Sequence, residues 1–223
     1  MRKSSSYAIP GNRIRYISSL FKDTPYKEST LVGDFRTPEV FVIDLHELDC
    51  LTFIEYVEAM RLSSSFPEFE KNLKKIRYRS GKIAFASRKH FFTDWREFNK
   101  DYVYDATEFV GGHKTMFERK HLNSKADGTA FVYGLQPFGR KIAYIPSRCL
   151  SGRMIDRLKT GDYVGIYADS PGLDVTHVGI LVKYGGKAYI RHASSQKKHR
   201  KVIDQEFKRY ASGRPGIIVL RPK

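Results

Sequence analysis

The stretch THVGILVKYGGKAYIRHA, residues 176–193, decides how this chain folds. Two apolar runs, rich in β-branched and aromatic residues, stand on either side of Gly185-Gly186. Paired glycines of this kind favour the positive φ angles of a two-residue hairpin turn. The pattern therefore predicts two antiparallel strands, over 176–184 and 187–193.

The same stretch places two histidines together. If Gly185-Gly186 forms the whole turn, His192 lies opposite Gly179, and His177 is two residues away on the same strand as Gly179. Because side chains alternate across a strand, both histidines project from one face, where diagonal neighbours lie roughly 7–8 Å apart. Gly179 leaves room for His192. A lone histidine on an apolar strand is more often a core residue, but two on one face favour a shared hydrogen-bond network.

The remaining segments extend this hairpin into an α+β fold. Strands are expected at 162–168 and 216–221, helices at 13–21, 50–62, 67–76 and 204–211, a short helix after Thr93, and a strand or extended segment at 39–44. Helices that precede an antiparallel sheet along the chain are typical of the α+β class.

Cys50 is the candidate nucleophile. Asp49 is a good N-cap, so Cys50 falls in the first helical turn, where free backbone N–H groups and the helix dipole stabilise a thiolate. A cysteine is also a small buried hydrophobe, and Cys149, in a loop-like context, is assigned that structural role. The two histidines on one face favour the catalytic interpretation, with Cys50 as nucleophile, His177 as base and His192 as the residue that orients the base.

The composition limits the class of protein. With 41% hydrophobic residues, the 223-residue chain can build a core, and its length suits one domain or one domain with an elaboration. The net charge of +16 favours polyanionic partners such as nucleic acid, anionic lipid or an acidic cell-wall polymer. Two cysteines exclude a disulfide scaffold and a four-cysteine zinc site. No apolar run is long enough to cross a bilayer, and no secretory signal is visible.

A candidate cleft lies in residues 77–150, whose weak periodicity is typical of binding regions. Arg88, His90, Asp94 and Trp95 cluster there, and the Trp95 ring offers a flat surface for a sugar while Asp94 offers an anchor. The alternative is an aromatic core with a solvated rim.

Three more residues are candidates for contacts with substrate. Asp49 has two compatible roles, as the helix cap and as a contact for a substrate amine or amide. Asp174 and Thr176 precede His177 in a loop from which they could orient substrate, although ordinary turn chemistry accounts for them as well.

Several motifs resemble one known family. Asp49-Cys50 at a helix start, with THVGI at 176–180 and IRHA at 190–193, is similar to the NlpC-type branch of the papain-like cysteine hydrolases. The segments that resemble its N-acetylmuramoyl-L-alanine amidase-like members are TPY at 24–26, LDCLTFIE at 48–55, SRKHFFTDW at 87–95, GLDVTHVG at 172–179 and HASS at 192–195. The chain departs from the wider family at Leu51, where many members have serine, and in the long stretch between Cys50 and the first predicted sheet strand.

The resemblance implies a papain-like α+β domain over 1–223, in which the Cys50 helix packs on a small antiparallel sheet of about five strands. It also implies an N-terminal arm over 1–35 and a largely helical insertion over 65–150 that lines the substrate cleft. The implied site needs no cofactor and no metal. The implied substrate is peptidoglycan or its muropeptide fragments, cut at the amide between the muramyl lactyl group and L-Ala, although relatives also cut within the stem peptide.

Such a substrate lies outside the cytoplasmic membrane, so we expect a periplasmic or exported protein, with a cytoplasmic enzyme that recycles wall fragments as the alternative. Cys50 must then stay unpaired with Cys149. We expect a monomer without a transmembrane segment, whose basic surface suits anionic polymers of the cell envelope.

Three other functions stay open. His177, His192, His90 and Asp174 could hold zinc, although no His-x-x-x-His spacing or cysteine pair supports this. Basic clusters at 71–79 and 197–201 could bind nucleic acid, but no nucleic-acid motif accompanies them. Papain-like relatives with a cysteine and two histidines also act as acyltransferases that modify lipids.

Overall fold

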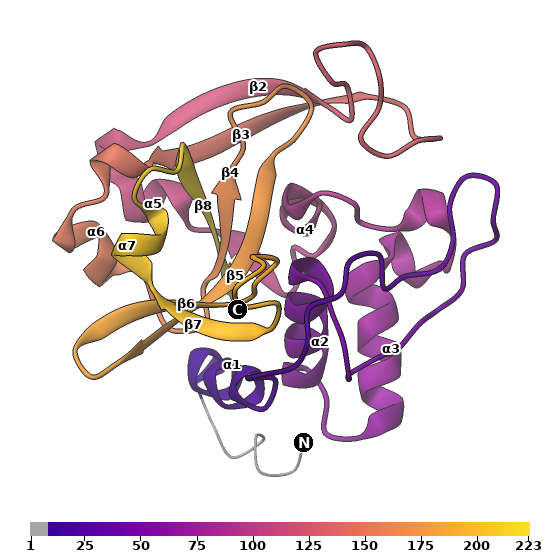
Figure 1. Cartoon of the computed structure of the whole chain (residues 1–223), viewed down its shortest axis with the longest axis horizontal. Coiled ribbons are helices and arrows are strands. Elements are labelled where there is room, and N and C mark those ends of the chain that lie inside the picture. Colours follow the sequence, from indigo (N-terminus) through magenta and orange to yellow (C-terminus); the bar gives the residue numbers. More distant parts are fainter. Residues whose placement is uncertain (1–8) are drawn as a thin grey trace.

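An antiparallel sheet forms the centre of the molecule in the computed structural model, which describes residues 9–223 (Figure 1). Its strands are β1 (Val103–Asp105), β2 (Met116–Leu122), β3 (Phe138–Pro146), β4 (Tyr163–Tyr167), β5 (Val175–Tyr184), β6 (Lys187–Ala193), β7 (Val202–Glu206) and β8 (Gly216–Pro222). The order is β2-β3-β8-β4-β5-β6-β7, with β1 also paired to β8, and every pair is antiparallel. β8 therefore lies between two halves of the sheet.

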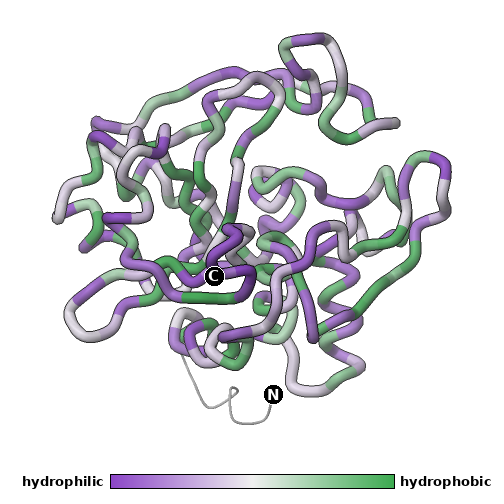
Figure 2. Tube along the Cα trace, in the orientation of Figure 1, coloured by the Kyte–Doolittle hydropathy of each residue, from purple (hydrophilic) through white to green (hydrophobic). Residues whose placement is uncertain are grey.

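Helices cover both faces of this sheet. They are α1 (Pro10–Ser19), α2 (Cys50–Arg61), α3 (Phe66–Arg77), α4 (Phe92–Phe98), α5 (Thr107–Gly111), α6 (Gly152–Arg157) and α7 (Phe207–Ala211). The first four share one apolar core with the sheet, and the last three share a second core on the opposite face, an arrangement visible in Figure 1. Figure 2 shows apolar residues along the strands in the middle of the molecule. Together these layers define a mixed α and β fold with an antiparallel sheet.

The hairpin forms with the predicted register. Tyr184 pairs with Lys187, and Gly185 and Gly186 adopt φ angles of 55° and 72°. A Cβ atom on Gly179 would lie 2.9 Å from the Cβ of His192, closer than real Cβ atoms approach, so glycine is required there. The turn and this close approach fix where the two histidines lie.

The predicted cap of α2 is also confirmed. One carboxylate oxygen of Asp49 accepts the backbone N–H groups of Leu51 at 3.0 Å and Thr52 at 2.8 Å, and the Thr52 hydroxyl accepts the Asp49 N–H at 3.0 Å. This reciprocal capping box satisfies donors that a helix start otherwise leaves unpaired. It fixes Cys50 as the first residue of α2.

Two expectations about the fold are wrong. The sheet has eight strands rather than about five, and the segment 65–150 is not largely helical because it supplies β1, β2 and β3. β2 is an edge strand with most of its side chains exposed, so it lacks the apolar alternation by which a strand is predicted. The expected helix at 204–211 begins only at Phe207, because the residues before it form β7.

The N-terminal segment lies against the body where it is described. α1 packs on α2, and Tyr26 pairs with Leu48 in an isolated bridge just before α2. Residues 1–8 of the predicted arm lie outside the described residues. Within 9–223, no helix is both long and apolar enough to cross a membrane.

Candidate active site

Two histidines and a glutamine form a hydrogen-bonded chain on one face of β5, β6 and β7. His177 Nε2 lies 2.7 Å from His192 Nδ1, and His192 Nε2 lies 2.8 Å from Gln205 Oε1. The two imidazole rings are perpendicular, with centroids 4.8 Å apart. His192 is buried, whereas His177 is partly open to solvent. The sequence predicted the histidine pair but not Gln205.

This chain assigns the protons of both rings when they are neutral. The Gln205 carbonyl oxygen can only accept, so His192 Nε2–H must donate to it. His192 Nδ1 is then an acceptor, and His177 Nε2–H donates to it. His177 Nδ1 therefore carries no proton, which leaves its lone pair free to act as a base.

The Cys50 thiol lies beside the backbone of Val178, the strand residue that follows His177. The Val178 N–H, from the residue next to His177, hydrogen bonds to the Cys50 sulfur. α2 packs on β5 and β6, so the start of the helix meets the end of β5 that carries His177. Both cysteines of the chain are free.

The thiol is protonated at rest. Burial, with the negative charge of Asp49 as a smaller cause, raises the pKa of Cys50 to about 12. The N–H groups of Val178, Cys50 and Leu51 act in the opposite direction and do not compensate. The N–H groups at the helix start thus favour the thiolate as expected, but burial and the capping carboxylate outweigh them.

The histidines are neutral at rest. Burial lowers the pKa of His177 to about 3 and that of His192 to about 4, and the positive charge of Arg214 lowers both further. The site thus pairs a neutral thiol with a neutral imidazole whose free nitrogen can accept a proton. General-base catalysis requires such a combination at neutral pH.

Two tyrosines that sequence reasoning did not assign complete the surroundings. The Tyr210 ring lies 4.9 Å from that of His192 and 6.4 Å from that of His177. Burial is the largest cause that raises the pKa of Tyr210 and of Tyr26 to about 12, and the nearby Cys50 sulfur, when ionised, contributes to both. Both phenols are thus neutral donors near the thiol. Tyr26 belongs to the TPY motif noted above, whereas Tyr210 gave no signal because 204–211 has the pattern of a surface helix.

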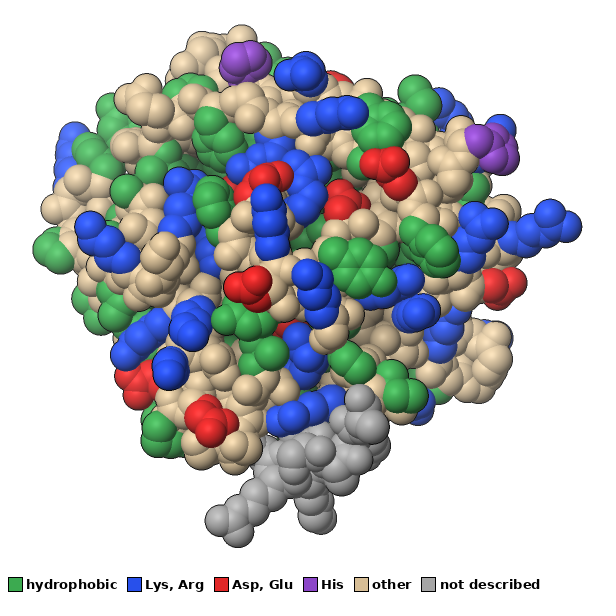
Figure 3. Space-filling model, turned by 180° about the vertical axis from the view of Figure 1, so that it is seen from behind, with side chains coloured by type: hydrophobic (Ala, Val, Ile, Leu, Met, Phe, Trp, Pro, Cys, Tyr) green, Lys and Arg blue, Asp and Glu red, His purple; other side chains and the backbone are tan. Residues whose placement is uncertain are grey.

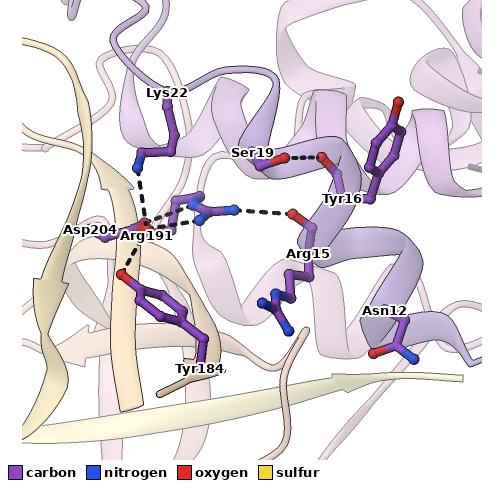
Figure 4. A pocket seen from close by; sticks show the side chains of 8 residues that line it. All are labelled: Asn12, Arg15, Tyr16, Ser19, Lys22, Tyr184, Arg191 and Asp204. Atoms are coloured by element: carbon purple, nitrogen blue, oxygen red, sulfur yellow. Dashed lines mark hydrogen bonds and ion pairs between the residues drawn. The ribbon is translucent and has the colours of Figure 1, made fainter. Parts of the chain in front are cut away.

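The opposite face of the same strands has a different chemistry. Arg191 and Asp204, each adjacent in sequence to a residue of the chain above, form a bidentate ion pair with N···O distances of 2.7 and 2.8 Å. Figure 4 shows this pair at the edge of a hollow beneath α1, with Lys22 and Tyr184 close to Asp204. Arg191 also donates to the carbonyl of Arg15, which ties α1 to the sheet.

Two predicted substrate contacts are wrong. Trp95 is fully buried and packs edge-on against Tyr163 with ring centroids 5.2 Å apart, so it presents no surface to a sugar. Asp94 is 1% exposed and pairs with Arg140 at 3.0 Å. Both residues belong to the core on the α4 side of the sheet, which was the alternative interpretation of this aromatic segment.

The other predicted contacts have mostly internal partners. Arg88 pairs with Glu39, and His90 Nε2 lies 2.8 Å from the Phe85 carbonyl. Asp174 is buried and accepts the Thr93 N–H at 2.7 Å, which holds α4 to the loop before β5. These three side chains position loops.

Asp49 and Thr176 remain candidates for contacts with substrate. Asp49 caps α2 and is partly exposed beside Cys50. Thr176 is exposed next to His177. Their roles toward substrate stay predictions.

The four residues considered for zinc do not meet. His90 and Asp174 have the separate partners described above, away from the histidine pair. Across residues 9–223, no three side chains of histidine, cysteine, aspartate or glutamate are grouped so that they could hold a metal ion.

Fold and site together define a class: an α+β protein whose antiparallel sheet presents a histidine pair beside a cysteine at a helix start. Within it, the sequence model of the N-acetylmuramoyl-L-alanine amidase-like family matches residues 16–217, and the chain belongs to that family. A search of curated proteins finds no match.

Solved structures agree with this membership. An N-acetylmuramoyl-L-alanine amidase from Bacteroides uniformis is 30% identical, with a TM-score of 0.82 over 96% of this chain and 99% of that one. A Bacteroides fragilis protein named as a candidate xylanase is 28% identical, with a TM-score of 0.76 over 92% of this chain and 99% of that one. A Legionella pneumophila protein shares the fold at 21% identity, with a TM-score of 0.80 over 96% and 89% of the two chains.

Proposed function

We propose that this protein is a papain-like, NlpC-type cysteine amidase that cleaves the bond between N-acetylmuramic acid and L-Ala in peptidoglycan or muropeptides. The family and the B. uniformis amidase support the substrate. The main support for the mechanism is the hydrogen-bonded chain from Gln205 through His192 to His177. The chain ends at the unprotonated Nδ1 of His177, and the next residue of the strand, Val178, contacts Cys50.

The first step forms a thioester. The Cys50 sulfur attacks the lactyl carbonyl carbon while its proton moves to His177 Nδ1, because thiol and imidazole both start neutral. The positive charge on His177 is stabilised by its hydrogen bond to His192. The C–N bond then breaks, and the L-Ala amine leaves with the proton from His177.

The second step uses water. His177 takes a proton from a water molecule that attacks the thioester carbon, and the Cys50 sulfur leaves and regains that proton as the muramyl acid is released. The Cys50 N–H is the natural donor to the oxyanion in both steps. Asp49 accepts the N–H groups of Leu51 and Thr52 but not that of Cys50, which stays available for the oxyanion.

The basic surface suits an anionic cell envelope. In Figure 3, lysine and arginine side chains are spread over the face seen from behind, with fewer acidic side chains between them. The net charge of +16 attracts acidic polymers over a range set by ionic strength. We propose that the protein acts as a monomer in the periplasm or outside the cell, which cell fractionation and sedimentation would check.

Digestion of purified muropeptides followed by mass spectrometry tests the proposed reaction, with Cys50→Ala as control. Release of an intact stem peptide that begins with L-Ala supports the amidase. Cleavage inside the stem identifies an endopeptidase, and transfer of the acyl group to an added amine or alcohol identifies an acyltransferase. Full activity in Cys50→Ala, or loss of wild-type activity with a chelator, contradicts the cysteine mechanism.

A further inference from the structure

A second hollow, of about 740 Å³, opens at the outer end of the histidine chain. Its walls come from the segment before β7, from β7 itself and from α7 with the turn that follows it. The basic, amide and phenolic side chains that line it are those of Lys198, His199, Gln205, Arg209, Tyr210 and Arg214. Its volume is within the range of small-molecule sites.

The hollow reaches the candidate active site through two residues. Gln205 hydrogen bonds to His192, and the Tyr210 ring packs on His192. Arg214 lies over the Tyr210 ring at 5.4 Å, and its charge acts on both histidines. Tyr210 also lies near the candidate nucleophile, because a charge on the Cys50 sulfur raises the pKa of its phenol, so Tyr210 faces both the hollow and Cys50.

The charges of this hollow are unbalanced. Its two carboxylates are already engaged, since Asp204 pairs with Arg191 and Glu206 accepts the N–H groups at the start of α7. Within residues 9–223, Lys198, Arg209 and Arg214 have no carboxylate partner, and all three are exposed. The hollow thus presents unpaired cations next to a reactive centre.

We propose that this hollow is a subsite for a carboxylate of the peptide part of the substrate, with Arg214 as its principal contact. The proposal rests on the function proposed above and adds the part of the substrate that fixes its orientation. A stem peptide carries free carboxylates, and a guanidinium recognises a carboxylate with two parallel hydrogen bonds. The subsite would favour muropeptides with free carboxylates over amidated ones.

The test compares a muropeptide with free peptide carboxylates and the same compound with its carboxylates amidated. We expect wild-type kcat/KM to be about 10- to 100-fold higher for the acid, mainly through KM. In Arg214→Gln this preference should fall to a few-fold, because the variant loses the guanidinium that binds the carboxylate of the acid. Lys208→Gln, at an exposed residue of α7 outside the hollow, is the matched control and should keep the full preference.

Binding separates failure of this subsite from failure of the proposed reaction. Calorimetry with the Cys50→Ala protein measures the affinity for both compounds without turnover, and the affinity for the acid should weaken with added salt. An equal affinity for acid and amidated compounds, or an unchanged preference in Arg214→Gln, would overturn the subsite. If the wild type binds the acid selectively but cleaves nothing, the subsite stands and the reaction is wrong.

Discussion

The two faces of the β6–β7 strand pair differ in how they accommodate polar side chains away from water. On one face the side chains of Arg191 and Asp204 are only 5% and 8% exposed, and each keeps its charge because the other neutralises it at 2.7 Å. On the other face His192 and Gln205 are bound at 2.8 Å, and the imidazole loses its charge instead. Neighbouring residues on the same two strands are thus buried either as an ion pair or as a neutral chain.

The difference accounts for the position of the proposed base on the histidine face and not on the ion-pair face. A buried ion pair has its protons fixed, since moving one would leave two desolvated groups unsatisfied. A neutral imidazole chain has one proton on each ring and one free nitrogen at its end, so a proton can enter at His177 without breaking a charge pair. The first face stabilises the fold and the second holds the proposed base.

The largest expected effect comes from removing the reacting groups. Cys50→Ala and His177→Ala should each lower turnover of muropeptides by about 10⁴-fold or more, because members of such a unit do not act additively. Both proteins should stay folded. Cys149→Ala is the matched control and should keep wild-type turnover. Steady-state kinetics of the three variants measures these effects. Near-normal turnover in His177→Ala would show that His177 is not the base.

The next largest effect concerns the ion-pair face, where a substitution should change the stability of the fold but not turnover. Arg191→Met should lower the free energy of unfolding by about 3–5 kcal/mol, because it leaves Asp204 with only Lys22 at 3.9 Å and the Tyr184 hydroxyl at 3.3 Å, and it releases α1. Urea unfolding measures the change. The double variant Arg191→Met/Asp204→Leu should recover much of it, and kcat per folded molecule should change little. A large loss of kcat in the folded single variant would show that the two faces are coupled.

A smaller loss is expected from the residues that orient the base. His192→Ala should lower kcat by about 100-fold and Gln205→Leu by about tenfold, because His177 keeps its own nitrogen but loses its fixed tautomer. Gln205→Glu should keep the acceptor and raise the pKa of both histidines. The acid limb of kcat/KM would then move to higher pH. An unchanged pH profile in Gln205→Glu would show that Gln205 has only a structural role.

The smallest effect concerns acid stability. The folded-state pKa values of His177 and His192, about 3 and about 4, lie below the ordinary value of 6.5, so the unfolded chain binds protons first as pH falls. Their contribution is complete above pH 6.5 and should decline toward pH 4 by at most about 1.4 kcal/mol per pH unit for each histidine. Urea unfolding from pH 7 to pH 4 measures this slope, which should be shallower in His192→Asn than in the wild type.

What the sequence predicts is local. The register of the hairpin follows from Gly185-Gly186, and the start of α2 follows from Asp49, because each depends on a few neighbouring residues. These two features alone put Cys50 at a helix start and both histidines on one face of a hairpin. The three candidate catalytic residues were therefore predictable without knowledge of the rest of the sheet.

What the sequence does not predict depends on distant partners. β7 reads as the beginning of a helix, and only its pairing with β6 makes it a strand and brings Gln205 to His192. The aromatic residues next to Trp95 in the sequence would be the same whether its ring faced a sugar or the core. Its packing against Tyr163, which is distant in the sequence, places the ring in the core. A side chain's partner across the fold leaves no local pattern in the sequence.

The position of β8 has a consequence for biosynthesis. Along the described chain it is the last strand to leave the ribosome, yet it lies between β3 and β4 and pairs with both. Until it has been translated, the β2–β3 hairpin and the strands from β4 to β7 are separate pieces with open edges, which are prone to pair with other chains. Whatever protects the nascent protein must therefore act until Gly216–Pro222 is free to insert.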